Sequence, residues 1–292
     1  MRTFEIVNFR IRLMQILPIK ILTPYIKHYL FLESTHDQHK KLRLFSDGNT
    51  GMVFLLNESN LSINHSQHLP HSFLYGQISH FQDLAFSEQA SFIIVVFQPD
   101  GLYRLLGIPA IELKDQIISS QEIFGSLANN LYDSLFNITY TTEKINALNT
   151  FFYELSLKRQ SPGQTLLPKV LQHIDQHKGL VTIEQLVNYT GYTERHIERT
   201  FAQQVGMSPK KYVNIIQLHS FLKLLRNKPT EANLTGISYE SGYFDQSHLI
   251  RMFKKYTGIT PSQYLNSTNR LAVNFMEFKD GPNQMSGLYN LV

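Results

Sequence analysis

Residues 242–264 read GYFDQSHLIRMFKKYTGITPSQY, and residues 191–212 read GYTERHIERTFAQQVGMSPKKY. The two stretches are copies of one pattern, because six positions of the first recur 52 residues later in the second. The recurring residues are Ile197, Arg199, Phe201, Gly206, Pro209 and Tyr212, which return as Leu249, Arg251, Phe253, Gly258, Pro261 and Tyr264. Gly191-Tyr192 returns as Gly242-Tyr243 after 51 residues, so the second copy has one extra residue after its turn. Such self-similarity indicates a repeated supersecondary unit, here a helix, a glycine-containing turn and a second helix.

Local signals define the helices of the first unit. Thr182 and Gln185 form a capping-box pattern, Gly191 is suited to a helix C-terminus, and Thr193 is placed to begin the next helix. The inward face of that next helix is expected to consist of Ile197, Phe201 and Val205, with Gly206 as its stop. Residues 209–225 predict one long apolar helix between the two units, about 25 Å long at 1.5 Å per residue.

Two such units can read DNA if their second helices enter the major groove. The exposed faces are expected to carry Arg195, Glu198 and Arg199 in the first unit and Gln246, His248 and Arg251 in the second. Arginine suits guanine edges, glutamine suits adenine, and a carboxylate suits the cytosine amino group. Phosphate contacts are expected from Lys210, Lys211, Lys254 and Lys255. The alternatives are that these charges only solvate helix faces, and that His196 and His248 pack against their turns.

The distribution of charge favours the DNA-binding interpretation. Residues 165–268 carry 12 basic and 7 acidic side chains, whereas residues 1–164 carry 13 basic and 14 acidic ones. The basic excess is therefore confined to one segment the size of a domain, the same segment that holds the repeat. A local basic excess is a weak footprint of polyanion binding when taken alone.

The residues quoted above also resemble those of AraC/XylS-family transcription regulators, over residues 167–265. The resemblance implies a seven-helix domain whose two recognition helices read adjacent grooves, in a bacterial protein that activates transcription together with RNA polymerase. It places the base-reading positions on Arg195, Glu198, Arg199, Gln246, Ser247, His248 and Arg251. The chain departs from the family pattern at Val187, Ser238 and Phe221, where the family favours alanine, and at Gln217, where it favours arginine.

The first half of the chain predicts strands followed by helices. Residues 28–32, 51–56 and 91–97 are short runs rich in β-branched and aromatic residues, typical of buried strands. Residues 142–157 predict a helix with Thr142 as its cap and an Ile/Leu/Phe stripe. The polar segment 158–164 predicts a linker. We therefore expect an α+β domain over 1–160, an all-α domain with two helix-turn-helix units over 161–268, and a tail over 269–292 that docks as a strand or frays.

The family resemblance implies that the first domain is a cupin-like barrel plus helices that senses an effector or dimerises. His65, His68, His71 and His80 lack the one-residue spacing and downstream acid of metal-binding cupins, so we expect a polar loop, no metal and no cofactor. Seven aromatic residues are candidates for a ligand pocket and equally for the core: Tyr25, Tyr29, Phe31, Phe73, Tyr75, Phe81 and Phe86. The 142–157 stripe either pairs with a second copy of the chain or packs on its own barrel.

Composition excludes several other classes of protein. The absence of cysteine excludes disulfide frameworks, cysteine-ligated zinc, iron–sulfur clusters and thiol catalysis. Charged residues interrupt 1–22, and no run approaches a membrane span, so we expect a cytoplasmic chain without membrane contact. The expected partners are double-stranded DNA, RNA polymerase, a small-molecule effector and a second copy of the chain. The alternatives to a sensing regulator are a ligand-independent regulator whose first domain only dimerises, and a cupin-type metal enzyme fused to a DNA-binding module.

Overall fold

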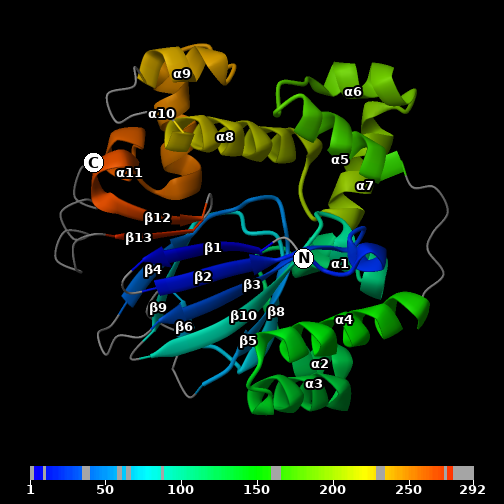
Figure 1. The fold of residues 1–292 in the computed structure, drawn as a ribbon. Helices are drawn as coiled ribbons and strands as arrows, with labels where there is room; N and C mark the ends of the chain where they lie inside the picture. The colour runs from blue at the N-terminus through cyan, green and yellow to red at the C-terminus, as the bar shows by residue number, and fades with distance from the viewer. Residues whose placement is uncertain are drawn as a thin grey trace.

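The computed structural model describes residues 3–8, 11–34, 40–57, 61–63, 67–86, 89–158, 166–227, 234–272 and 275–278. A barrel of strands with its own helices lies at one end of the molecule, and a group of further helices covers the other end (Figure 1). The linker predicted at 158–164 lies almost entirely outside the described residues, which resume at Leu166.

Two antiparallel sheets form the barrel. The first has seven strands, in the order β1 (Thr3–Asn8), β2 (Ile11–Ile16), β3 (Ile26–Ser34), β10 (Ala90–Phe97), β5 (Gly51–Leu55), β8 (Ser72–Tyr75) and β11 (Ile117–Ser119). The second has six, in the order β12 (Thr268–Ala272), β13 (Phe275–Phe278), β4 (Lys40–Leu44), β9 (Gln82–Phe86), β6 (Leu61–Ile63) and β7 (Gln67–His68). The predicted α+β class, with a cupin-like barrel, is confirmed.

The central strands β10 and β5 of the seven-stranded sheet are buried on both faces. Along β10, Phe92, Ile94 and Val96 point into the barrel interior, and the alternating residues pack under helices on the outer face. The outer helices are α1 (Gly101–Leu106), α2 (Ser120–Phe124), α3 (Ser126–Asn137) and α4 (Thr141–Lys158), with the short turns η1 (Lys20–Leu22) and η2 (Ala110–Leu113). Burial on both faces is the reason that the strand runs are continuously apolar instead of alternating with polar residues.

The stripe of α4 packs on the chain's own barrel. Ile145, Leu148 and Phe152 are buried, and the Phe152 ring lies edge-on to Phe97 with 5.6 Å between ring centroids. The stripe is therefore not available for pairing with a second copy. The predicted cap is wrong: the helix begins before Thr142, and the Tyr140 carbonyl accepts hydrogen bonds from the first turn.

Seven helices form the second part of the described chain: α5 (Leu166–Gln176), α6 (Ile183–Thr190), α7 (Glu194–Gln204), α8 (Pro209–Asn227), α9 (Leu234–Glu240), α10 (Gln246–Thr257) and α11 (Pro261–Ser267). Helices α6 and α7 form the first predicted unit, and α9 and α10 form the second. Helix α8 runs between them across the top of the barrel (Figure 1). The capping box of Thr182 and Gln185 and the left-handed Gly191, with φ of 73°, are confirmed.

The last described strands return to the barrel. Strand β12 follows α11 directly, β13 pairs with β12, and β13 also pairs antiparallel with β4, with Phe275 opposite Leu44. The segment after the second unit therefore docks as strands and extends the six-stranded sheet. Residues 279–292 of the predicted tail lie outside the described residues.

Candidate nucleic-acid interface

One face of helix α7 is apolar and buried, and the opposite face is polar and exposed. Its N-cap is Thr193, whose Oγ1 accepts a hydrogen bond from the His196 backbone N–H at 3.3 Å. Ile197, Phe201 and Val205 are buried as predicted. The predicted base readers Arg195, Glu198 and Arg199 are all exposed and line a shallow hollow on one side of the helix.

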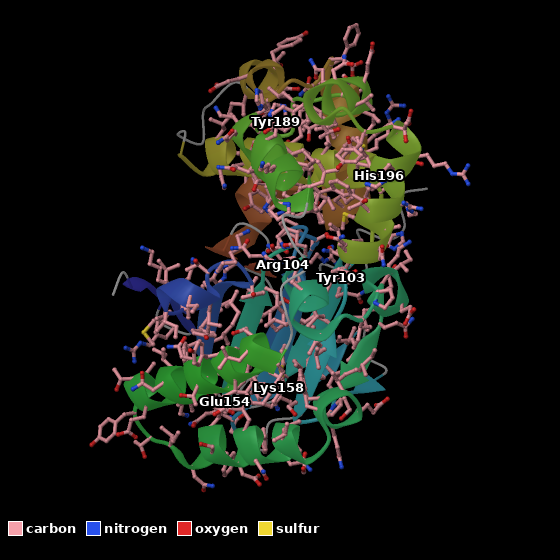
Figure 2. The ribbon with its side chains drawn as sticks, turned by 90° about the vertical axis from the view of Figure 1, so that its right-hand side faces the viewer. Tyr103, Arg104, Glu154, Lys158, Tyr189 and His196 are labelled. Carbon is pink, nitrogen blue, oxygen red and sulfur yellow. The ribbon has the colours of Figure 1, made fainter. Side chains whose placement is uncertain are left out.

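His196 belongs to the outer end of α7, away from the barrel (Figure 2). Its ring stacks on Tyr192, with 4.5 Å between centroids and 17° between planes. Its Nδ1 also lies 3.5 Å from Nη2 of Arg199. These contacts place His196 beside the base-reading side chains and against its own turn.

Helix α10 repeats this arrangement. Its N-cap Asp245 accepts a hydrogen bond from the His248 backbone N–H at 2.6 Å, and Leu249, Phe253 and Tyr256 are buried. The predicted base readers Gln246, Ser247 and Arg251 are exposed. His248 is half-buried, and its ring lies edge-on to Tyr243 at 5.7 Å, which favours the packing alternative for this residue.

Helix α8 fixes the second unit through a residue where the chain departs from the family pattern. Phe221 is fully buried and makes edge-on contacts with Tyr243 and Phe253, at 6.1 and 5.9 Å between centroids. Gln217 donates a hydrogen bond from Nε2 to the carbonyl oxygen of Ser241 at 3.0 Å. The large side chain at 221 thus forms part of a shared aromatic core.

The four lysines that are predicted to contact phosphate lie in different environments. Lys210, Lys254 and Lys255 are exposed. Lys211 instead donates a hydrogen bond from Nζ to Oγ of Ser79 in the barrel domain at 2.8 Å. Burial and nearby lysines lower the pKa of Lys211. The structure therefore directs Lys211 toward the barrel, which corrects the expectation that it faces outward with Lys210.

The barrel domain contacts both recognition helices at their C-terminal ends. Gly206 and Gly258 occupy the same position of the repeat and have φ of 85° and 77°. A Cβ on Gly206 would lie 2.7 Å from the carbonyl oxygen of Ala110, and one on Gly258 would lie 2.5 Å from the Phe81 ring. The N-terminal ends of both helices, which carry the predicted base readers, therefore point away from the barrel.

Arg43 of β4 stabilises the contact between the barrel and the C-terminal end of α10. Its guanidinium binds both carboxylate oxygens of Asp83, at 2.6 and 2.7 Å, and lies over the Phe81 ring at 4.0 Å from the centroid. Its Nη1 donates to the carbonyl oxygen of Thr257 at 3.3 Å. Arg43 is only 2% exposed, so one buried cation joins the barrel to the end of α10.

A cavity of about 1000 Å³ lies between the barrel interior and helices α5 and α8. The barrel interior supplies an apolar lining, and charged and polar side chains from both parts of the chain line the end next to α5 and α8, here called the mouth. The apolar lining includes Leu30, Val53, Phe73, Leu84, Ile94 and Val96, and the mouth includes Lys27, His28, Asp47, Asp175, Lys178, His219 and Lys223. Sequence reasoning missed this mouth; the one available signal was His219, a lone histidine within the apolar connector helix.

Burial controls the charges at the cavity mouth. Burial lowers the pKa of His28 to about 4, helped by Lys27, and burial also lowers the pKa of His219. His219 Nε2 donates to the carbonyl oxygen of Ser46 at 2.9 Å. Burial raises the pKa of Asp175, opposed by the charges of Lys27 and Lys223. Both histidines are therefore neutral near pH 7.

The other candidates in the barrel domain divide among three environments. Phe73 and Tyr75 line the cavity, whereas Tyr29 and Phe31 lie in the core under the outer helices. The remaining aromatics are in core or contact positions: Tyr25 packs against that same core, Phe86 fills the barrel interior, and Phe81 lies under Arg43.

The predicted histidine loop lies partly outside the described residues. His65 lies there, and His71 and His80 are exposed. Within the described ranges, no three His, Cys, Asp or Glu side chains are placed to share a metal ion. No helix of the described ranges is long and apolar enough to span a membrane.

Comparison with known proteins supports the assignment of the repeat. A family model described as "Helix-turn-helix domain" matches residues 186–267, which hold most of both units. Residues 186–267 therefore form a helix-turn-helix domain of the AraC/XylS type. A second model, described as a domain of unknown function (DUF6597), matches residues 14–119 of the barrel.

The curated relatives match only part of the chain. An uncharacterized HTH-type transcriptional regulator of Haemophilus influenzae is 33% identical over 30% of this chain and 28% of its own length. The HTH-type transcriptional activator RhaR of Escherichia coli is 27% identical over 51% of each chain. The chain thus spans about half, or less, of the length of these relatives. The crystal structure of ToxT from Vibrio cholerae aligns over 80% of this chain and 96% of its own, with 13% identity and a TM-score of 0.44.

Proposed function

We propose that this chain is a sequence-specific, DNA-binding transcription regulator, an activator, that reads two adjacent major grooves. One observation carries the proposal: two repeat-related helices, α7 and α10, expose base-reading side chain types at their outer ends while the barrel holds their inner ends. The proposed base readers are Arg195, Glu198, Arg199, Gln246, Ser247 and Arg251, and the proposed phosphate contacts are Lys210, Lys254 and Lys255. Its partners are double-stranded DNA, RNA polymerase and a second copy of the chain.

Selection of random duplex DNA by the full-length chain tests this function. Two recognition helices on one face of a duplex lie about one turn apart, roughly 34 Å. We therefore expect one asymmetric site with two preferred blocks about 10 base pairs apart. A single block means that one unit alone reads bases. No enriched sequence, despite salt-sensitive binding, contradicts sequence-specific recognition.

Arg251→Ala is expected to weaken binding to the selected site by about 1–3 kcal/mol and to relax preference at one base pair. Arg251 is exposed on the outer face of α10, so its loss removes a base contact without opening the core. Quantitative binding to the selected duplex and to its single-base variants measures both effects. Equal losses on selected and random DNA would show that Arg251 does not read a base.

Lys254→Ala is the matched control for Arg251→Ala. Lys254 lies one turn further along the same exposed face and is proposed to contact phosphate. Its removal is expected to weaken all sequences alike and to reduce the salt slope of log affinity by about one unit. The pair of variants therefore separates base reading from backbone binding.

We infer that the cavity between the barrel and α8 binds the effector. Its apolar lining suits a molecule with an apolar body, and its mouth suits a polar end group. Because Lys27 belongs to the barrel and Lys223 belongs to α8, a bound molecule contacts both parts of the chain at once. Its binding therefore favours one orientation of the DNA-binding helices relative to the barrel.

A thermal-shift screen with molecules of one apolar body and different end groups tests the cavity. We expect a rise in melting temperature with at least one end group, and loss of that rise in Ile94→Phe, which fills the apolar end. Arg251→Ala is expected to keep the rise, because it lies outside the cavity. No response across sugars, acids, amines, alcohols and aromatics favours a regulator whose barrel only dimerises.

We propose that the chain is not an enzyme, because its helix-turn-helix domain and its relatives are those of transcription regulators. The cupin-type enzyme alternative requires a bound metal. Elemental analysis of the purified chain separates the two interpretations of the barrel. A stoichiometric transition metal supports the cupin-type enzyme, and its absence supports a barrel without metal chemistry.

A further inference from the structure

The outer face of α10 contains an apolar side chain among its polar ones. Helical residues follow one another by about 100°, so Gln246, Ser247, Ile250, Arg251 and Lys254 share one arc of the helix. Ile250 is 37% exposed within that arc. Leu249 and Phe253 are buried on the adjoining face of the helix, and Ile250 is not among the partly buried residues that pack against their core.

A second apolar side chain lies at the outer end of the same unit. Phe244 immediately precedes the N-cap Asp245 and is 88% exposed, more than any other large hydrophobic residue in the described ranges. Phe244 is the extra residue of the second copy, and the residue that precedes the N-cap in the first unit, Tyr192, is 45% exposed and stacks on His196. The second unit therefore displays apolar surface where the first covers its ring.

The internal repeat shows what is particular about Ile250. Its counterpart 52 residues earlier is Glu198, which is exposed on α7. The neighbouring position carries arginine in both units, as Arg199 and Arg251. The two recognition helices thus share one base-reading residue and differ in chemistry at the adjacent position.

The major groove distinguishes these two chemistries. Cytosine presents an amino group that donates a hydrogen bond, whereas thymine presents a carbonyl oxygen and a 5-methyl group. A carboxylate accepts from the cytosine amino group, and an apolar side chain gains by burying the thymine methyl. An isoleucine facing cytosine would leave that amino group without a partner.

We propose that Ile250 reads a thymine methyl group in the half-site of the second unit, at the position where Glu198 reads cytosine in the half-site of the first. Phe244 makes a second methyl contact at the outer end of α10. The proposal rests on the proposed DNA-binding function. The partner of this surface is DNA, because Ile250 lies between Gln246, a proposed base reader, and Lys254, a proposed phosphate contact. The two half-sites are therefore unequal, and the regulator binds in one direction only.

Replacing thymine by uracil in the selected duplex tests the contact, because it removes only the methyl group. At one position of the second block, the wild-type chain is expected to lose about four-fold in affinity, the value for burying one methyl group. Ile250→Ala is expected to bind the thymine and uracil duplexes equally at that position. Phe244→Ala is expected to lose the discrimination at a different thymine.

A reciprocal exchange gives a second readout. Ile250→Glu is expected to change the preferred base from thymine to cytosine in the second block, and Glu198→Ile is expected to change cytosine to thymine in the first. Both residues are exposed, so the variants keep the fold, which the melting temperature verifies. Repeating the random-duplex selection with each variant reports the preferred bases directly.

The results separate failure of the proposal from failure of the function. If the wild-type chain selects a two-block site but no uracil substitution distinguishes it from Ile250→Ala or Phe244→Ala, the methyl contacts are wrong and DNA reading stands. Unchanged base preference in Ile250→Glu also overturns the methyl contact and leaves DNA reading intact. If the wild-type chain enriches no sequence, the proposed function fails, and the exposed apolar pair belongs to a protein-binding surface.

Discussion

Replacing Arg43 with methionine is expected to lower the free energy of unfolding by about 3–5 kcal/mol, the usual cost of breaking a buried ion pair from one side. Arg43 is 2% exposed and binds Asp83 through two hydrogen bonds of 2.6 and 2.7 Å. Methionine keeps much of the volume over Phe81 but leaves the Asp83 carboxylate without its cation. Urea unfolding followed by far-UV circular dichroism measures the loss.

The double variant Arg43→Met/Asp83→Leu is the control. With both charges removed, no unpaired buried carboxylate remains, and most of the lost stability is expected to return. The double variant still lacks the hydrogen bond to Thr257, so the remaining deficit measures the link between barrel and second unit. A single variant within about 1 kcal/mol of wild type would show that the Arg43 pair contributes little.

Gly206→Ala is expected to destabilise the chain more than Gly191→Ala does. Both glycines have left-handed φ, 85° and 73°, so alanine costs each about 1–2 kcal/mol in the backbone. No atom of the described residues lies within 4 Å of a Cβ on Gly191, whereas one on Gly206 would meet the Ala110 carbonyl at 2.7 Å. The barrel contact therefore adds about 1–3 kcal/mol of overpacking at Gly206 alone.

Gly191→Ala carries the same backbone strain without the contact. The difference in stability between the two variants therefore measures the contact between the barrel and the first unit. Urea midpoints of both variants and limited proteolysis provide the measurement. Gly206→Ala should also be cleaved faster between barrel and helices. Equal midpoints and equal cleavage would mean that the Ala110 contact does not hold the two parts together.

The second half of the chain could be predicted well from sequence because its signals are local. Thr182 with Gln185, Thr193, and the left-handed Gly191 each fix one helix end through groups within a few residues. The 52-residue repeat then extended this evidence from one unit to the other. The outward positions of Arg195 and Arg251 followed from helix periodicity alone.

The contacts between the two parts of the chain could not be predicted in this way. Arg43 follows Lys40-Lys41 in a segment that has the pattern of solvated charge, yet Asp83 is 40 residues away and Thr257 is 214 residues away. Lys210 and Lys211 are adjacent and chemically identical, and only the position of Ser79 separates their roles. Pairings between distant segments carry no periodicity, so they appear only when the strands and helices are assembled.

The pairing of β13 with β4 also bears on how the chain is made. Phe275 lies opposite Leu44, so the edge of the six-stranded sheet is extended only after the ribosome has synthesised both helix-turn-helix units. Until then β4 presents an open edge to other nascent chains, the situation in which strands mispair and aggregate. Contacts of such long sequence separation also form slowly. The nascent DNA-binding units can therefore fold before the barrel sheet is complete, and release from the ribosome lets the hairpin close that edge.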